Sequence, residues 1–162
     1  MARLYQRRYL KCPYNRARDL LAEAVQGAAQ TGDERLMRLT FAIPAVPGAE
    51  VGKDVAVTVC PARDPMHFDQ PWHLRWEPVG GLYPTFEGTL TVRADESYAS
   101  SMLELEGTYS PPLGAAGAAF DTLIGQRIAA ETARELLRRI GGTIEARYHA
   151  TEDAKDTVSK DA

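Results

Sequence analysis

The stretch Tyr109-Ser-Pro-Pro-Leu-Gly-Ala-Ala-Gly-Ala-Ala-Phe120 separates two kinds of sequence and decides the fold. Before it, apolar residues alternate with polar ones; after it, they recur every third or fourth residue as far as Tyr148. Because proline has no backbone N–H for a sheet ladder, Pro111 and Pro112 end the preceding strand. The later spacing predicts one helix from Gly117 to Tyr148, roughly 48 Å long.

The weak point of this predicted helix is the pair Gly141-Gly142. Each glycine costs roughly 1 kcal/mol against alanine inside a helix. The apolar stripe continues through Ile144 and Tyr148, so we expect a bend at the glycines and not an end. A helix of this length needs a broad surface to pack on, and the first part of the chain supplies strands.

Five segments before the long helix carry the alternation of a strand with one apolar face: residues 37–43, 55–60, 72–77, 86–93 and 102–109. Residues 3–12 are rich in tyrosine and leucine, which suits a first strand. A helical stripe begins near Ala17 and is expected to end near Gln30. The short connections favour antiparallel pairing. We therefore predict an α+β fold, in which a curved antiparallel sheet of six to seven strands wraps around the C-terminal helix. Residues 1–149 would form one domain, and residues 150–162 a flexible polar tail.

The composition limits the partners. The chain has 162 residues, of which 44% are hydrophobic and 25% charged, with a formal net charge of −3. This charge disfavours nucleic acid as a partner, and no apolar run reaches the roughly 18–20 residues of a membrane span. No secretory signal opens the sequence, and Cys12 and Cys60 are expected to be reduced thiols, so we predict a cytoplasmic protein. The oligomeric state stays open.

Four segments stand out in the second half of the chain: Gly88-Thr-Leu-Thr-Val92, Leu103-Glu-Leu-Glu-Gly-Thr-Tyr109, Pro111-Pro-Leu-Gly114 and Phe120-Asp-Thr-Leu-Ile-Gly-Gln-Arg-Ile-Ala-Ala130. Together they resemble the SRPBCC superfamily, the START-like helix-grip fold with its polyketide cyclase/dehydrase and lipid-transport branches. The resemblance is best over residues 83–148, less than half of the chain. It implies a seven-stranded sheet gripping the last helix around an apolar cavity. The family often has two helices after the first strand, so a second short helix or turn is expected in residues 28–34.

Three functions are open. The first is non-enzymatic binding or transport of a hydrophobic small molecule or lipid in a cavity between the sheet and the C-terminal helix. The second is a polyketide cyclase/dehydrase-like enzyme, and the third is an interaction module with a filled core. The same apolar residues could line a cavity or fill a core. The predicted ligand-binding residues are Trp72, Trp76, Phe86, Leu103, Leu105, Phe120, Ile124 and Ile128. The first helix and the loop from Pro44 to Gly52 could close the cavity mouth.

No pattern in the sequence points to a cofactor, a metal or a catalytic residue. His67, Asp69, His73 and Glu77 have a spacing that fits no metal motif we know, and no serine or cysteine has a nucleophile context. Glu104 and Glu106 alternate on one strand, which usually means exposure to solvent. If they faced the cavity instead, burial would raise their pKa values and make acid–base chemistry possible.

Overall fold

The computed structural model describes residues 1–25, 29–32, 34–46, 49–63, 66–80, 83–111 and 118–160. Within these ranges the backbone alone is described for residues 29–31, 41–46, 49–51, 53, 118–124 and 158–160. The elements are β1 (Ala2–Leu10), α1 (Tyr14–Ala24), β2 (Ala29–Thr31), β3 (Glu34–Val46), β4 (Ala49–Pro61), β5 (Trp72–Pro78), β6 (Thr85–Ala94), β7 (Ser101–Ser110) and α2 (Ala118–Lys160).

The described strands form one antiparallel sheet in the order β1-β7-β6-β5-β4-β3-β2. Every neighbouring pair is antiparallel. Strands β2 to β7 follow one another as a meander, and β1 closes the order by pairing with β7 from Ala2↔Tyr109 to Leu10↔Ser101. The α+β class, the antiparallel pairing and the long C-terminal helix predicted from the sequence are confirmed.

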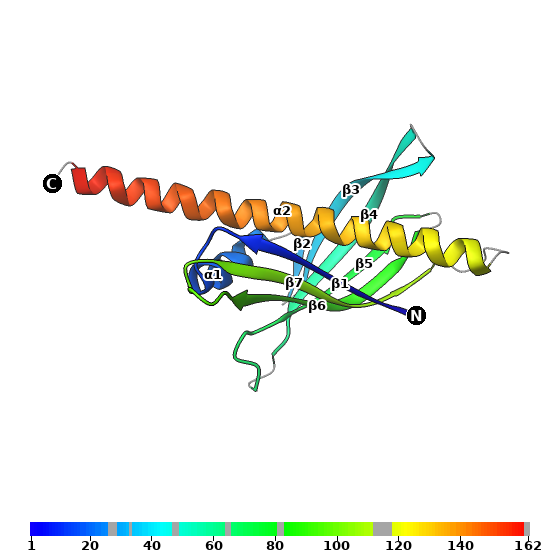
Figure 1. Cartoon of the computed structure of the whole chain (residues 1–162), viewed down its shortest axis with the longest axis horizontal. Coiled ribbons are helices and arrows are strands. Elements are labelled where there is room, and N and C mark those ends of the chain that lie inside the picture. The colour runs from blue at the N-terminus through cyan, green and yellow to red at the C-terminus, as the bar shows by residue number, and fades with distance from the viewer. Residues whose placement is uncertain are drawn as a thin grey trace.

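The sheet is curved, and α2 runs across it as a continuous helix (Figure 1). α2 contacts β1, β7 and β3, while the short helix α1 packs against α2 and the ends of β6 and β7. The C-terminal end of α2 projects past α1, and the β3–β4 hairpin projects past α2 on the opposite side (Figure 1). The core therefore lies between one face of the sheet and the two helices.

Alternation along the strands decides which side chains enter this core. Trp72, Leu74 and Trp76 of β5 are buried, whereas His73, Arg75 and Glu77 between them are exposed. The inner residues of α2 fall at helical spacing and include Ala129, Ala133, Leu136, Leu137, Ile140 and Ile144, all buried. Burial of such apolar surface is worth about 25 cal/mol per Å² and is the main force that docks α2 on the sheet.

The glycine pair of α2 has two different surroundings. A Cβ at Gly141 would lie 2.6 Å from Nε and 2.7 Å from Cδ of Arg8 on β1, whereas a Cβ at Gly142 would meet nothing within 4 Å. Gly141 therefore lets β1 approach the helix closely. The carboxylate of Glu145, one turn further on, accepts bonds from the Arg8 guanidinium at 3.1 Å and the Lys11 backbone N–H at 2.9 Å.

The predicted helix ended at Tyr148, but α2 continues to Lys160, so residues 150–160 of the predicted polar tail are helical. The segment has no apolar period, and the side chains of residues 153–157 are exposed as expected. Neither proline nor glycine occurs after Gly142, so nothing in the sequence breaks the helix. An ion pair between Lys155 and Glu152 at i,i+3 spacing, 2.9 Å long, supports its last turns.

Three further predictions are corrected in the first half of the chain. α1 ends at Ala24, not near Gln30, and residues 29–31 form the strand β2 where a second helix or turn was expected. Gly32 has φ +60, which suits the tight turn between Thr31 and its pairing partner Glu34. The segment from Pro44 to Gly52 was predicted as a loop, but β3 and β4 pair along it, with a register shift between Pro44 and Val46.

Candidate functional site

The predicted ligand-binding residues of the sheet all point into the core. Trp72, Trp76, Phe86, Leu103 and Leu105 are buried and belong to one hydrophobic cluster. Ile128 of α2 is partly buried and packs against that cluster. The side chains of Phe120 and Ile124 lie outside the described residues. The five sheet residues therefore belong to one packed region of the core.

Trp76 and Phe86 are in direct contact within this packed region. Their rings stack with centroids 4.2 Å apart and an angle of 16° between the planes. The indole Nε1 of Trp76 donates a buried hydrogen bond of 3.0 Å to the carbonyl of Pro84. Stacking and the hydrogen bond together fix the indole, so this tryptophan acts as a structural residue.

A pair of glycines makes room for the Phe86 ring. Gly88 of β6 and Gly107 of β7 are direct partners in the sheet. A Cβ at Gly88 would lie 2.6 Å from the Phe86 Cζ and 2.2 Å from the backbone oxygen of Glu106. No side chain fits at this close approach of the two strands, which is one reason for glycine inside a strand.

A polar connection that the sequence pattern does not predict crosses the core between Tyr83 and α2. Tyr83, which is 2% exposed, bonds through its hydroxyl to the Oγ1 of Thr132 on α2. Thr132 donates its own proton to the carbonyl of Ile128 at 2.8 Å, so Tyr83 is the donor to Thr132. Burial raises the pKa of Tyr83, which keeps the phenol a neutral donor. A tyrosine preceding a proline carries no signal for such a bond.

A pocket of about 680 Å³ lies beside α1, and we call it the α1 pocket. Its walls come from α1, the end of β4, the connection from β4 to β5 and the start of β5. The residues that line it are Arg18, Asp19, Ala22, Pro61, Ala62, Arg63, Gln70, Pro71 and Trp72. Its size is within the range of about 300–1,000 Å³ that is usual for small-molecule sites. Of the predicted ligand-binding residues whose side chains are described, Trp72 is the one that lines it.

The indole of Trp72 is held by an arginine from β3. The guanidinium carbon of Arg35 stands 5.0 Å from the centroid of the Trp72 ring. The same guanidinium donates to the carbonyl of Ala22 on α1. Arg35 thus joins the first tryptophan of β5 to the last turn of α1, and it fixes the apolar wall of the pocket.

The charges of the α1 pocket are unevenly buried. A guanidinium nitrogen of Arg18 lies 3.7 Å from a carboxylate oxygen of Asp19. The Arg18 side chain is 33% exposed, whereas that of Asp19 is 63% exposed. Arg18 also lies over the ring of Tyr14, with its guanidinium carbon 5.8 Å from the centroid. The cation is therefore the more enclosed member of the pair, and the carboxylate is the more solvated one.

The connection that forms one wall of the pocket is fixed by Asp69. One carboxylate oxygen accepts a hydrogen bond of 2.8 Å from the hydroxyl of Tyr14, and the other accepts one of 2.8 Å from Arg93 on β6. Arg93 also donates to Glu104 at 3.2 Å, and Glu104 accepts from Tyr5 of β1 at 2.9 Å. This series of bonds ties the β4–β5 connection to α1 and to three strands.

The backbone of Gln70, next to Asp69 in the same wall, is strained. Gln70 has φ +47, an uncommon value for a residue other than glycine, and its backbone N–H donates to the carbonyl of His67 at 3.1 Å. The Ala62 N–H donates to the carbonyl of Pro71 at 2.9 Å, which closes the connection on itself. The surrounding bonds therefore hold a backbone conformation that the chain would not adopt freely.

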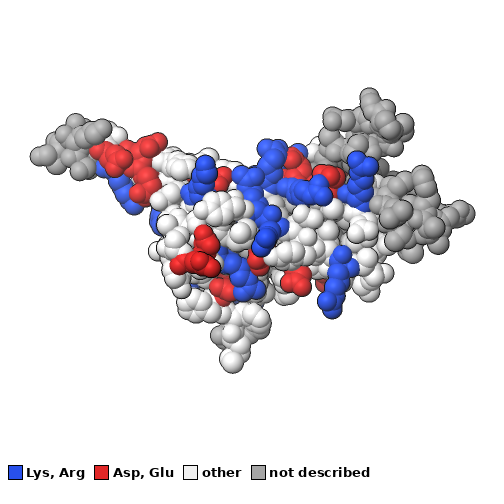
Figure 2. Space-filling model, in the orientation of Figure 1, with Lys and Arg blue, Asp and Glu red and all other residues white. Residues whose placement is uncertain are grey.

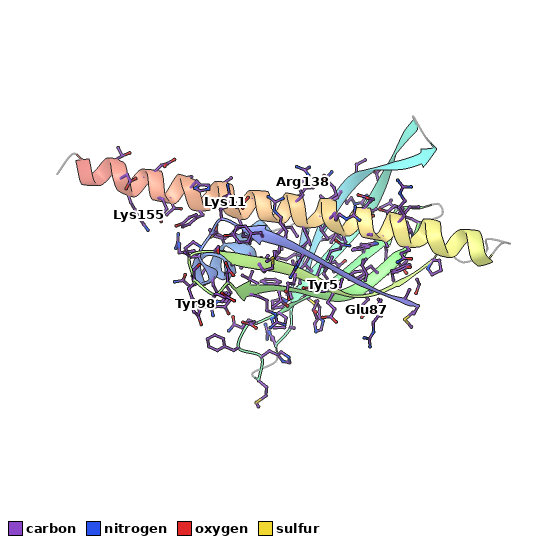
Figure 3. The ribbon with its side chains drawn as sticks, in the orientation of Figure 1. Tyr5, Lys11, Glu87, Tyr98, Arg138 and Lys155 are labelled. Carbon is purple, nitrogen blue, oxygen red and sulfur yellow. The ribbon has the colours of Figure 1, made fainter. Side chains whose placement is uncertain are left out.

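The outer face of the sheet carries the charged residues of the strands. His73, Arg75 and Glu77 are exposed there, as is Glu106, and Glu104 is held by its bonds to Tyr5 and Arg93. Figure 3 shows Tyr5 and Glu87, two further residues of the strands. Among the described residues, no group of three or more histidine, cysteine, aspartate or glutamate side chains could hold a metal ion.

The charged surface that faces the viewer in Figure 2 mixes basic and acidic side chains without a large area of one sign. On α2, Glu135 bonds to Arg138 and to Arg139 at 2.7–2.8 Å. These bonds, with that to Arg138 the largest effect, hold the pKa of Glu135 at about 2. No described helix of the chain is long and apolar enough to span a membrane.

Comparisons with known proteins extend to the fold alone. No protein-family model matches the sequence, and no curated protein matches it significantly. Among solved structures, the chain is similar to the crystal structure of TTHA0849 from Thermus thermophilus, with a TM-score of 0.60 and 15% sequence identity. The match covers 90% of this chain and 99% of that one. The two chains therefore share a fold over nearly their whole length.

Proposed function

We propose that this protein is a START-like helix-grip domain that binds or carries an apolar small molecule without transforming it, and that the α1 pocket is where the ligand binds. The observation that carries this proposal is the pocket itself: about 680 Å³, with an apolar wall of Ala22, Pro61, Ala62, Pro71 and Trp72. The sequence placed the site between the sheet and α2, where the described side chains of the sheet are packed together.

The cyclase/dehydrase alternative depended on acids facing a cavity. Glu104 and Glu106 were its two carboxylate candidates, and both lie on the outer face of the sheet. Glu104 is engaged there by Tyr5 and Arg93. The acidic residue among the described residues that line the α1 pocket, Asp19, has a side chain that is 63% exposed to water. This placement favours binding over acid–base catalysis.

The test is uptake of a neutral dye whose fluorescence rises in apolar surroundings, such as Nile red. We expect saturable binding at one site per chain. In the variant Ala62→Trp, the new indole would occupy the pocket and abolish uptake. Ala150→Trp is the matched control, because Ala150 is exposed on α2 and does not line the pocket. It should bind like the wild type.

Two results would contradict the proposal. If the wild-type protein never takes up the dye, the interaction module with a filled core becomes the better interpretation. If Ala62→Trp and Ala150→Trp bind the dye equally well, the ligand does not occupy the α1 pocket. Circular dichroism and thermal unfolding of both variants would establish that they are folded before binding is compared.

A further inference from the structure

The strand β1 lies at one end of the sheet order and pairs with β7 along one of its two edges. Among the described residues, no strand pairs with its other edge. α2 packs on the inner face of β1, where a Cβ at Gly141 would lie 2.9 Å from Cδ2 of the buried Leu10. The edge of a strand presents a row of backbone N–H and C=O groups to which a further strand can bond. In β1 this row is nine residues long.

The outward-facing side chains of β1 are arginines and tyrosines in alternation. Arg3, Tyr5, Arg7 and Tyr9 are all exposed, and the two tyrosines are 49% and 51% exposed. Tyrosine and arginine are the residue types that are enriched where proteins bind one another. Charged residues on an edge strand normally prevent pairing, because like charges that face each other repel. The register of the pairing decides whether the arginines do so here.

One symmetric register of two antiparallel copies of β1 avoids this repulsion. With the two-fold axis at Gln6, Arg3 lies opposite the partner's Tyr9, and Tyr5 lies opposite the partner's Arg7. The symmetry repeats both pairs, so every arginine of the two strands faces a tyrosine ring and none faces another arginine. Gln6 meets the partner's Gln6, and a side-chain amide has both the donors and the acceptor that such a self-pairing needs.

The neighbouring registers lack this property. An axis at Tyr5 would place Arg3 opposite the partner's Arg7, and an axis at Arg7 would place Arg7 opposite itself. A register between two residues would set an outward residue of one strand against an inward residue of the other, which the pleat does not allow. The side-chain pattern of β1 therefore favours one symmetric register.

We propose that this chain forms a homodimer in which β1 pairs antiparallel with β1 of a second copy, in the register centred on Gln6. The two sheets then continue into one, and the same surface serves both subunits, as in any two-fold contact. Because the contact is built on a single pair of strands, it is small, and we expect a dissociation constant on the order of micromolar. It uses none of the described residues that line the α1 pocket, so it goes beyond the proposed function.

The first experiment is analytical ultracentrifugation of the wild-type protein across a concentration series that spans the micromolar range. We expect the mass to rise from that of one chain to that of two. Tyr9→Arg places an arginine opposite the partner's Arg3 at two symmetric positions, so it should weaken the dimer about tenfold. Adding Arg3→Glu to this variant turns the repulsion into an opposite-charge pair and should restore the dimer.

The matched control is Tyr98→Arg. Tyr98 is an exposed tyrosine in the connection from β6 to β7 and does not belong to β1. This variant adds the same positive charge as Tyr9→Arg but places it outside the proposed contact. It should dimerise like the wild type.

The second experiment tests the register by cross-linking. In Gln6→Cys the two new thiols would lie opposite each other at the axis, with about 5.5 Å or less between the Cα atoms, so oxidation should give a covalent dimer. Tyr9→Cys is the comparison, because the two copies of residue 9 would lie roughly 20 Å apart and should not cross-link. The wild type, with its own Cys12 and Cys60, gives the background of the reaction.

Several results would overturn the proposal. A wild type that stays monomeric throughout the concentration series removes the dimer. Equal dimerisation of Tyr9→Arg and Tyr98→Arg means that the contact does not use β1. A covalent dimer from Tyr9→Cys and none from Gln6→Cys contradicts the register, as does a dimer that Arg3→Glu fails to restore. None of these measurements involves the dye, so a failure of ligand binding at the α1 pocket would leave the dimer standing.

Discussion

Two tryptophans on the same face of β5 lie in different surroundings. Trp76 is fully buried, its ring stacks on Phe86, and its indole N–H donates to the carbonyl of Pro84. The ring is therefore packed on its face and hydrogen-bonded at its nitrogen. Trp72, four residues earlier, is 9% exposed, with Arg35 over its ring and the α1 pocket beside it. Alternation along a strand fixes which face a residue occupies. Whether that position is filled core or pocket wall depends on what lies across from it.

The largest expected effect comes from removing each ring in turn. Trp76→Ala should lower the free energy of unfolding by about 4 kcal/mol, because it leaves a closed cavity and an unpaired carbonyl. Trp72→Ala should cost about half as much, because water can enter the space from the α1 pocket, but it should weaken dye binding. Urea unfolding and dye titration measure the two quantities. Equal losses of stability would mean that the two sites do not differ as described.

The next largest effect is expected from adding a large side chain, either in the core or in the α1 pocket, so the two regions are compared directly. Leu105 is completely buried, so Leu105→Trp should destabilise the fold by roughly 2 kcal/mol while dye uptake persists. Ala62→Trp should do the reverse, abolishing uptake at little cost in stability. If Leu105→Trp removes uptake and leaves stability unchanged, the ligand lies between the sheet and α2. That is where the sequence first placed it.

These differences show how much of the fold and of the candidate site could be predicted from the sequence. The long helix, the antiparallel strands and the inward faces followed from local periods of two and 3.6 residues, because each element buries one side. The expected end of the helix at Tyr148 was wrong because missing apolar periodicity does not end a helix: residues 150–160 contain neither proline nor glycine. The strand β2 was missed because three residues show no period.

The α1 pocket was not predictable from these patterns. Its wall combines Arg18 of α1, Arg63 and Gln70 of an irregular connection, and the first residue of β5, Trp72. Such residues are brought together by the way element ends meet in three dimensions. Alternation identified Trp72 but grouped it with the core residues of the same strand. Asp69 was considered as a metal ligand, and its actual role is to hold the wall of the pocket.

A smaller effect is expected at the wall of the pocket. Asp69→Asn keeps the size of the side chain but weakens its bonds to Tyr14 and Arg93. We expect a loss of stability of about 1 kcal/mol, since the carboxylate is partly exposed. Dye affinity should fall by more than this loss implies, because the wall that contains Gln70 becomes less well fixed. A double-mutant cycle with Tyr14→Phe measures the coupling, and no coupling would mean that Asp69 does not hold the connection.

The smallest effect is expected on the solvent-facing side of α2, which belongs neither to the packed core around Trp76 nor to the α1 pocket. Arg138, seen on α2 in Figure 3, and Arg139 hold the pKa of Glu135 at about 2, below its ordinary value of 4.5. A carboxyl group with a lowered pKa in the folded state stabilises the fold above pH 4.5 and loses that contribution as the pH falls toward 2. The stability difference between wild type and Glu135→Gln should therefore be constant near neutral pH and shrink between pH 4.5 and 2. Dye uptake at neutral pH should not change, because Glu135 does not line the α1 pocket. A difference in stability that stays the same down to pH 2 would show that the arginines do not stabilise this carboxylate, and reduced uptake would show that the two surfaces are coupled.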